Sequence, residues 1–195
     1  MKDDRPYHSA IAANDAAIEC PEVYMTKQRN GVAAVWDIME GHELPAIYER
    51  CDLIYSEPAW PSGLSNFMER VGKDGPTFKD YMARIRWIVE TANKPTAMVV
   101  GKTALSYMPE TKRVIPVSLN GGRALIAFWN GAYADGVTND DVIRDLAKQY
   151  NIVGDFSCGY GNTGRIFQAA GKSYVLTDVN PKCIGYIYDH AEGWG

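Results

Sequence analysis

The segment 155–164, with the sequence DFSCGYGNTG, constrains the fold of this chain more than any other feature. It lies between a predicted strand, NIVGDF (151–156), and a predicted helix, NTGRIFQAAG (162–171). Gly159 and Gly161 let the backbone pass close to a bound ligand. The next predicted strand ends at Asp178, roughly 20 residues further on, where a carboxylate can accept hydrogen bonds from both hydroxyls of a ribose. The unit therefore predicts an α/β fold with a nucleoside site at the sheet edge.

Two other interpretations of this unit stay open. The glycines could simply make a tight turn while Asp178 caps the helix that starts near Asn180, although capping explains Asp178 alone and not the whole constellation. Dinucleotide binding is the other alternative. Its Gly-x-Gly-x-x-Gly motif usually opens a domain, whereas here only one strand and one helix follow the loop.

The rest of the chain alternates strands and helices. Helical spacing of apolar residues in 77–94 predicts an amphipathic helix, and Asn120-Gly121-Gly122 between two apolar runs predicts an antiparallel hairpin. Thr138 or Asn139 caps a further helix with acids in its first turn. The other predicted elements are strands at 31–39, 51–56, 96–101 and 173–178, a short helix at 43–50, and a final helix at 181–191.

A second motif, Glu57-Pro58-Ala59-Trp60, follows the predicted strand CDLIYS, at the carboxyl end where open α/β sheets place their sites. A carboxylate, a proline and an aromatic ring in this order could accept hydrogen bonds from an amine and stack on a planar ring. The alternative is structural: Pro58 and Pro61 would stiffen a loop, and Trp60 would fill the core.

Composition limits the remaining possibilities. The 195 residues, 46% of them apolar, suffice for one core, and the net charge of −4 does not favour nucleic acid globally. Lys79, Arg84, Arg86 and Lys94 could contact phosphate, or could form a solvated helix face. The four cysteines show no metal-ligand spacing, so we expect reduced thiols and no metal. Without a long apolar run, we expect a cytoplasmic protein with no membrane contact.

Taken together, the two motifs resemble those of DNA amino-methyltransferases, the enzymes that methylate adenine N6 or cytosine N4. In that family the cofactor loop reads Asp-Pro-Phe-x-Gly-x-Gly, and the catalytic loop reads Asp-Pro-Pro followed by Tyr, Phe or Trp. DFSCGYGNTG resembles the former and EPAW the latter, in the beta-like order with the catalytic motif first. Glu57 replaces the usual Asp or Asn, Ala59 replaces the second Pro, and the Pro after Asp155 is missing.

The resemblance implies a Rossmann-like methyltransferase sheet of seven strands with one antiparallel hairpin, circularly permuted, within a three-layer α/β/α domain. That domain would span 31–195, after an N-terminal arm or cap at 1–30. The cofactor would be S-adenosylmethionine (SAM), and the catalytic residues would be Glu57, Pro58 and Trp60. The residues implied to bind the cofactor are Asp37, Asp155, Ser157, Cys158, Gly159, Gly161, Asn162, Thr163, Asp178 and Val179.

The function implied first is methylation of an exocyclic amine of adenine or cytosine in DNA. Residues 60–155 are nearly all taken up by the sheet and leave no obvious domain for reading a DNA sequence, so residues 1–30, a second subunit in a homodimer or a partner could supply target recognition. Two alternatives stay open: a methyltransferase of a nucleotide, a small molecule or a protein, which the acidic net charge favours, and a cofactor-binding protein that has lost catalysis.

Overall fold

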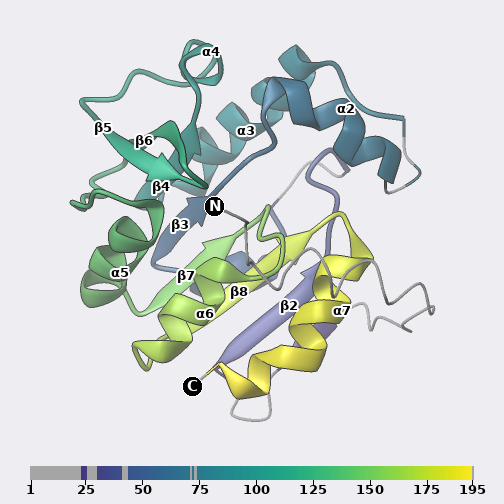
Figure 1. Ribbon diagram of the computed structural model, residues 1–195, viewed down its shortest axis with the longest axis vertical. Helices are drawn as coiled ribbons and strands as arrows, with labels where there is room; N and C mark the ends of the chain where they lie inside the picture. The colour runs from purple at the N-terminus through teal and green to yellow at the C-terminus, as the bar shows by residue number, and fades with distance from the viewer. Residues whose placement is uncertain (1–22, 26–29, 41–43, 71, 73, 195) are drawn as a thin grey trace.

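A mixed β-sheet forms the middle layer of the protein (Figure 1). The structure, a computed structural model, describes residues 23–25, 30–40, 44–70, 72 and 74–194. Most of the predicted N-terminal arm, including Cys20, therefore lies outside the described residues. The strands are β1 (Val23–Met25), β2 (Gly31–Val35), β3 (Leu53–Ser56), β4 (Thr96–Val100), β5 (Arg113–Leu119), β6 (Gly122–Trp129), β7 (Ile152–Asp155) and β8 (Ser173–Asp178).

The strand order is β1-β2-β8-β7-β3-β4-β6-β5. The five strands from β2 to β4 in this order run parallel, whereas β1 and β6 are antiparallel to their neighbours. The predicted hairpin is confirmed: Leu119 pairs with Gly122 across a two-residue turn. Both turn residues, Asn120 and Gly121, have positive φ (51° and 78°), as a tight hairpin turn of this hand requires.

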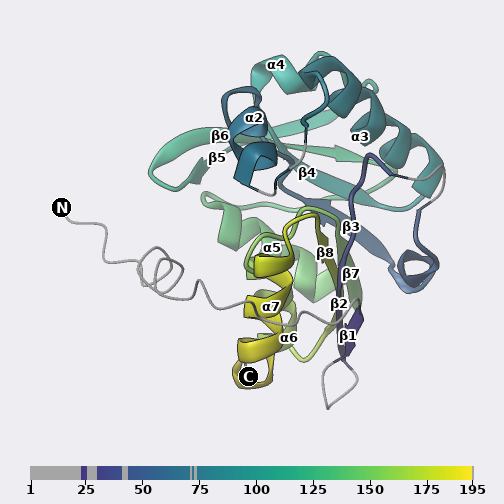
Figure 2. The same ribbon diagram turned by 90° about the vertical axis from the view of Figure 1, so that its right-hand side faces the viewer.

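Helices cover both faces of the sheet, which gives three layers (Figure 2). One face packs against α5, α6 and α7 through side chains such as Leu146, Phe167 and Ile184. The other face packs against η1, α2 and α3 through Tyr48, Leu64 and Ile85, among others. The helices are η1 (Ala46–Arg50), α2 (Pro61–Arg70), α3 (Phe78–Ala92), α4 (Lys102–Leu105), α5 (Asn139–Gln149), α6 (Asn162–Ala169), α7 (Pro181–His190) and η2 (Ala191–Gly193).

Local sequence signals explain where the main helices begin. The hydroxyl of Thr138 accepts a hydrogen bond from the backbone N–H of Asp141, whose side chain bonds back to the N–H of Thr138, so that both satisfy donors at the start of α5. The side chain of Asn180 accepts the backbone N–H of Lys182 at the start of α7, and Pro181 occupies the first turn, where a missing N–H costs nothing.

Two elements differ from the sequence-based expectation. Seven strands match the predicted ones, and Val23–Met25 adds an eighth at the edge, antiparallel to β2. Helix α2 was not predicted, because the Pro, Ser and Gly of its first turn are typical of a loop. Pro61 is in fact the first helical residue, a position that tolerates proline. Within the described ranges, no helix combines the length and apolar character needed to cross a bilayer.

Candidate active site

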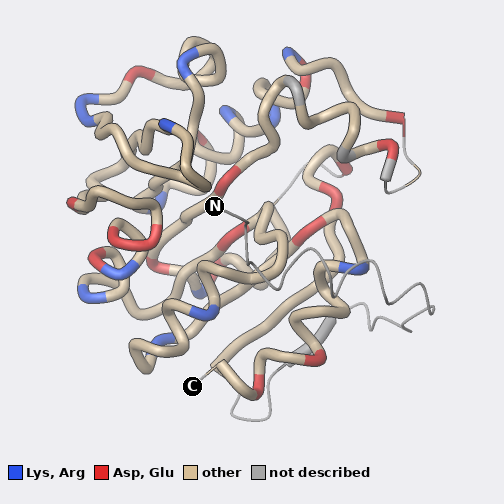
Figure 3. The backbone as a smooth tube through the Cα atoms, in the orientation of Figure 1, with Lys and Arg blue, Asp and Glu red and all other residues tan. Residues whose placement is uncertain are grey.

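Four neighbouring strands carry an acidic residue at or just beyond their carboxyl ends. In the order β2, β8, β7, β3, these residues are Asp37, Asp178, Asp155 and Glu57. Because carboxyl ends of parallel strands meet at one edge of a sheet, the four carboxylates form a row there. Figure 3 shows acidic positions in the middle of the molecule as well as along its outer helices and turns, where most basic positions lie. This edge is therefore suited to a cation.

Asp155 is the most enclosed member of the row, with 2% of its surface exposed. Its carboxylate accepts hydrogen bonds from the hydroxyls of Ser56 (2.9 Å) and Thr163 (2.8 Å) and from the backbone N–H of Ser157 (3.1 Å). Burial nevertheless raises the pKa of Asp155 to about 6, because removal from water penalises the charged form more than these donors stabilise it. Asp155 therefore gains or loses its proton close to neutral pH.

Asp178 connects the end of β8 to the glycine loop, residues 156–161. One carboxylate oxygen accepts the N–H of Gly159 and the other accepts the N–H of Asn180, both at 2.9 Å. Burial raises the pKa of Asp178, and the two backbone donors oppose that rise. A carboxylate has about four acceptor positions, so two backbone bonds leave capacity for further hydroxyl donors.

Two glycines of the loop have positive φ for different reasons. Gly159 has φ of 51°, and apart from its two chain neighbours no described residue has an atom within 4 Å of where a Cβ would stand, so its backbone borders open space in the cleft described next. Gly161, with φ of 82°, precedes α6, and a Cβ there would lie 2.5 Å from the ring of Trp194. Gly159 thus leaves room for a ligand, whereas Gly161 allows close internal packing.

A cleft of about 540 Å³ opens between the glycine loop and the strand ends, a volume within the range of small-molecule sites. Four carboxylates line it, together with one guanidinium. Its lining residues are Tyr55, Glu57, Ala59, Tyr81, Leu119, Asn120, Asn139, Asp140, Asp155, Ser157, Cys158, Gly159, Tyr160, Asn162, Thr163, Arg165 and Asp178.

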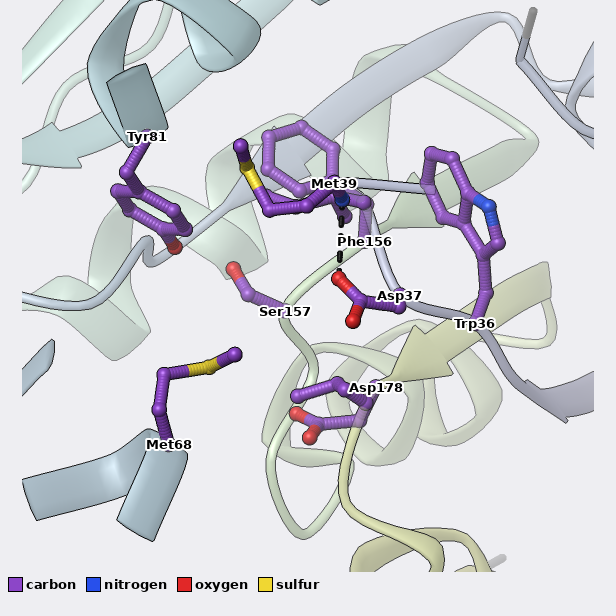
Figure 4. Close-up of a pocket in the computed structure, with 10 residues that line it drawn as sticks. Trp36, Asp37, Met39, Met68, Tyr81, Phe156, Ser157 and Asp178 are labelled. Atoms are coloured by element: carbon purple, nitrogen blue, oxygen red, sulfur yellow. Dashed lines mark hydrogen bonds between the residues drawn. The ribbon is translucent and has the colours of Figure 1, made fainter. Parts of the chain in front are cut away.

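A smaller pocket of about 30 Å³ adjoins this cleft (Figure 4). Tyr81, Ser157 and Asp178 line both cavities, so the two meet at these side chains. The carboxylate of Asp37 accepts the backbone N–H of Met39 at 2.9 Å, which fixes it at the pocket wall. The other lining residues are Trp36, Ile38, Met68, Phe156 and Val179, so most of the wall is apolar.

The acidic loop, residues 57–60, faces the cleft from the end of β3. Glu57 and Ala59 line the cleft directly. Burial raises the pKa of Glu57 to about 7, and the negative charges of Asp155 and Asp140 contribute to the rise. A carboxyl group with this pKa can accept a proton near neutral pH.

The other two predicted catalytic residues lie on the far side of this loop. Pro58 and Trp60 line a third cavity, of about 10 Å³, whose walls include Val100 and Ala104. The Trp60 ring packs beside Gly101, where a Cβ would come within 3.3 Å of it. The backbone of Trp60 also begins α2, since its carbonyl accepts the N–H groups of Gly63 and Leu64.

The structure gathers most of the predicted cofactor-binding residues around the two cavities. Gly161 lines neither of them and makes the turn into α6. The apolar periodicity of 77–94 places Tyr81 on the buried face of the predicted helix, but periodicity cannot show that a buried hydroxyl borders a cavity. Asn139 and Asp140 were predicted only as the start of a helix. That helix directly precedes the glycine-loop strand, and this position is the signal that could have identified them.

Three of the four basic residues suggested for phosphate contact have other partners. Arg84 donates to the carbonyl of Ile38 (2.6 Å), and Lys94 donates to the carbonyls of Glu49 and Cys51 (3.0 and 2.7 Å). Arg86 forms an exposed ion pair with Glu90, four residues along α3. Lys79 is exposed.

Comparison with known proteins rests on structure alone. No family model and no curated protein matches the sequence. The crystal structure of the M1.HpyAVI–SAM complex matches with a TM-score of 0.53 and 12% identity, over 82% of this chain and 98% of that one. A second structure of M1.HpyAVI gives 0.51 and 13%, over 80% and 96%.

The structure of TTHA0409 from Thermus thermophilus, a proposed DNA modification methylase, also matches. Its TM-score is 0.51 at 12% identity, and the match covers 79% of this chain and 91% of that one. At such identities the likeness concerns the fold, and all three matches span nearly the whole of the other chain. The protein thus has the three-layer Rossmann-like fold of these methyltransferase structures.

Proposed function

We propose that this protein transfers a methyl group from SAM to the exocyclic amine of adenine or cytosine in DNA. The observation that carries the proposal is that the glycine loop, Asp178 and Glu57 all line one cleft. The fold of M1.HpyAVI, which was crystallised with SAM, and of TTHA0409, a proposed DNA modification methylase, supports it.

The residues at the cleft fit the cofactor. SAM supplies, when bound, a methyl group on a positively charged sulfur, and a row of carboxylates favours such a cation. Asp178 would accept hydrogen bonds from the ribose hydroxyls, and Gly159 offers the open backbone that a close ligand requires. Asp37 and Val179 line the adjoining pocket, whose volume of about 30 Å³ is too small to enclose an adenine, so the base would lie where this pocket meets the cleft, beside its apolar walls.

The acidic loop would hold the acceptor. An exocyclic amine is a poor nucleophile because its lone pair is delocalised into the ring. Glu57, which lines the cleft, would accept one N–H hydrogen and so orient the nitrogen for attack. Pro58 lines the third cavity, so its carbonyl would have to turn towards the cleft to accept the other. The amine gives up one proton on methylation, and Glu57, with its pKa of about 7, can take it up. Trp60 packs beside Gly101 at the third cavity, so its ring would have to turn towards the cleft before it could stack on the acceptor ring.

The strand order fits a circularly permuted chain. The glycine-loop strand, β7, is seventh in sequence but lies inside the sheet, between β8 and β3. On this proposal the methyltransferase domain spans 31–195, with β1 added at the edge of its sheet by the preceding segment, and β2 is the strand that follows β8 in an unpermuted relative. A base within duplex DNA would have to leave the stack to enter the cleft, at a cost of a few kcal/mol. A second subunit or a partner would supply target recognition.

A second candidate is methylation of a small acceptor such as a nucleoside. The acidic cleft and the engaged basic side chains of α3 favour it, because phosphates near four carboxylates are repelled.

The test is transfer from SAM labelled in its methyl group to duplex DNA, single-stranded DNA, RNA and free nucleosides, at several salt concentrations. Label in DNA supports the first proposal, and label in nucleosides alone supports the second. Cofactor binding without transfer to any of these acceptors would refute both and indicate a binding protein.

A further inference from the structure

The middle peptide of the acidic loop is held by a side chain from another element. The hydroxyl oxygen of Tyr81, on α3, accepts the backbone N–H of Ala59 at 3.0 Å. Tyr81 is 6% exposed, and burial raises its pKa further above the ordinary value, so the phenol stays protonated. Figure 4 shows its ring reaching from the helix with the hydroxyl towards Ser157.

This hydrogen bond determines more than the position of Ala59. The N–H of Ala59 and the carbonyl of Pro58 belong to the same peptide unit, and the described residues contain no cis peptide bond. In a planar trans unit these two groups point in opposite directions. Holding the N–H against Tyr81 therefore turns the Pro58 carbonyl away from Tyr81 and limits where the neighbouring Glu57 can lie.

The two ends of the loop are anchored separately. Ser56 belongs to β3, and the carbonyl of Trp60 accepts the first hydrogen bonds of α2. The peptide between them lies beside the cleft, where water or a ligand could otherwise compete for its N–H. A partner that is already in place avoids reorganisation when an acceptor enters.

We infer that Tyr81 is a positioning residue: its hydroxyl fixes the 58–59 peptide and thereby holds the neighbouring Glu57 carboxyl at the cleft, facing the acceptor amine. The inference rests on the proposed function, because in that function the acidic loop binds the acceptor amine. It adds a residue from α3, outside both sequence motifs, to the acceptor side of the site.

The first test is Tyr81→Phe, which keeps the ring and removes only the hydroxyl. Methyl transfer from labelled SAM to DNA should slow roughly tenfold to a hundredfold in kcat, because a loosely held group loses its alignment. The dissociation constant for SAM should change less than kcat does, because the Tyr81 ring, which also borders the pocket assigned to the adenine, is kept in the variant. The matched control is Tyr133→Phe, which removes a hydroxyl bonded to Asp135 on the exposed surface and should change neither quantity.

A double-mutant cycle then separates positioning from general loss of structure. Ala59→Pro removes the N–H that Tyr81 holds. In the Ala59→Pro background, Tyr81→Phe should cause no further loss of kcat. A full additional loss there, an unchanged kcat in Tyr81→Phe alone, or an equal loss of SAM affinity would overturn the inference.

Amide hydrogen exchange gives a measure that needs no transfer at all. Exchange at Ala59 should be faster in Tyr81→Phe than in the parent, whereas Tyr133→Phe should leave it unchanged. Unchanged exchange at Ala59 would overturn the inference even if transfer fell. If the parent protein transfers no methyl group to any acceptor, the proposed function fails, and faster exchange still shows that Tyr81 anchors the loop.

Discussion

The backbone N–H of Gly159 donates a 2.9 Å hydrogen bond to the carboxylate of Asp178. This bond joins the two parts of the first sequence motif, the glycine loop after β7 and the acid at the end of β8. It means that the carboxylate is held at the cleft by the same loop whose open backbone borders the ligand space. The affinity for the cofactor should therefore depend on Asp178 strongly.

Asp178→Ala should weaken SAM binding by roughly tenfold or more, because ribose hydroxyls and the Gly159 N–H lose their acceptor. Isothermal titration measures the affinity, and thermal denaturation shows how much of the change is loss of fold. Asp189→Ala, on the exposed side of α7, makes the same change in net charge and should leave the affinity unchanged. An unaltered affinity in Asp178→Ala would mean that the ribose lies elsewhere.

Glu57→Gln should reduce methyl transfer by roughly a hundredfold or more and leave SAM affinity within a few fold, because it removes the proton acceptor and keeps the shape. In the parent, the transfer rate should rise with pH and level off above about 7, the pKa to which burial raises Glu57. The variant should lack this rise. Glu69→Gln, on the exposed face of α2, is the matched control. Retained turnover in Glu57→Gln would remove Glu57 from the mechanism.

The carboxyl groups of the cleft should make the protein less stable as pH rises from about 4 to 7. The pKa of Asp155 is about 6 in the folded protein against an ordinary 3.8, and that of Glu57 is about 7 against 4.5. Within these intervals the folded state binds more protons than the unfolded state, so the free energy of unfolding falls with rising pH. Urea denaturation at pH 5 and pH 7.5 measures the fall, and Asp155→Asn should make it smaller.

SAM affinity should increase as pH rises, in contrast to stability, because the ionised carboxylates attract the positive charge of SAM. The dissociation constant should be lower at pH 8 than at pH 5, and binding should release protons, which titration in buffers of different ionisation enthalpy detects. Tighter binding at pH 5 would contradict the assignment of the cleft to a cation.

Gly159→Ala and Gly161→Ala should separate ligand space from internal packing. Both residues have positive φ, so each substitution costs about 1–2 kcal/mol of backbone strain. At Gly161 the added methyl also collides with Trp194, and the melting temperature should fall further. At Gly159 the methyl points into space that no described residue beyond its chain neighbours fills, so the larger effect should be on SAM affinity, roughly tenfold or more. Equal effects of the two variants on affinity would argue against this division.

The sequence predicted the sheet well, because most strands are short apolar runs bounded by clear turn or cap signals. SYVLTD matches β8 residue for residue, and the Asn120-Gly121 turn is where its chemistry places it. Helix α2 escaped prediction because its Pro, Ser and Gly are typical of a turn when read without tertiary context. Val23–Met25 was missed because three residues carry too little periodicity to identify a strand.

The site was predictable where it depends on motifs and not where it depends on packing. Asp155, Asp178 and Glu57 each end or follow a strand, so their meeting at one edge follows from the parallel order. Tyr81 reaches the cleft from the middle of a helix, and only the packing of α3 against the acidic loop shows it. The side of the loop to which Trp60 turns likewise depends on the space beside Gly101, which no local pattern encodes.

The place of β7 and β8 in the sheet also governs how the molecule assembles. A ribosome completes β2, β3 and β4 well before the two strands that separate β2 from β3 have been made. Until then β2 and β3 have open edges towards each other, across a gap two strands wide. Pairs such as Leu53 with Val153 form late and join residues far apart in the sequence, which slows folding. Until they form, the open strand edges of the incomplete sheet can pair with strands of other chains. The last strands to emerge are therefore the ones that join the two halves of the sheet.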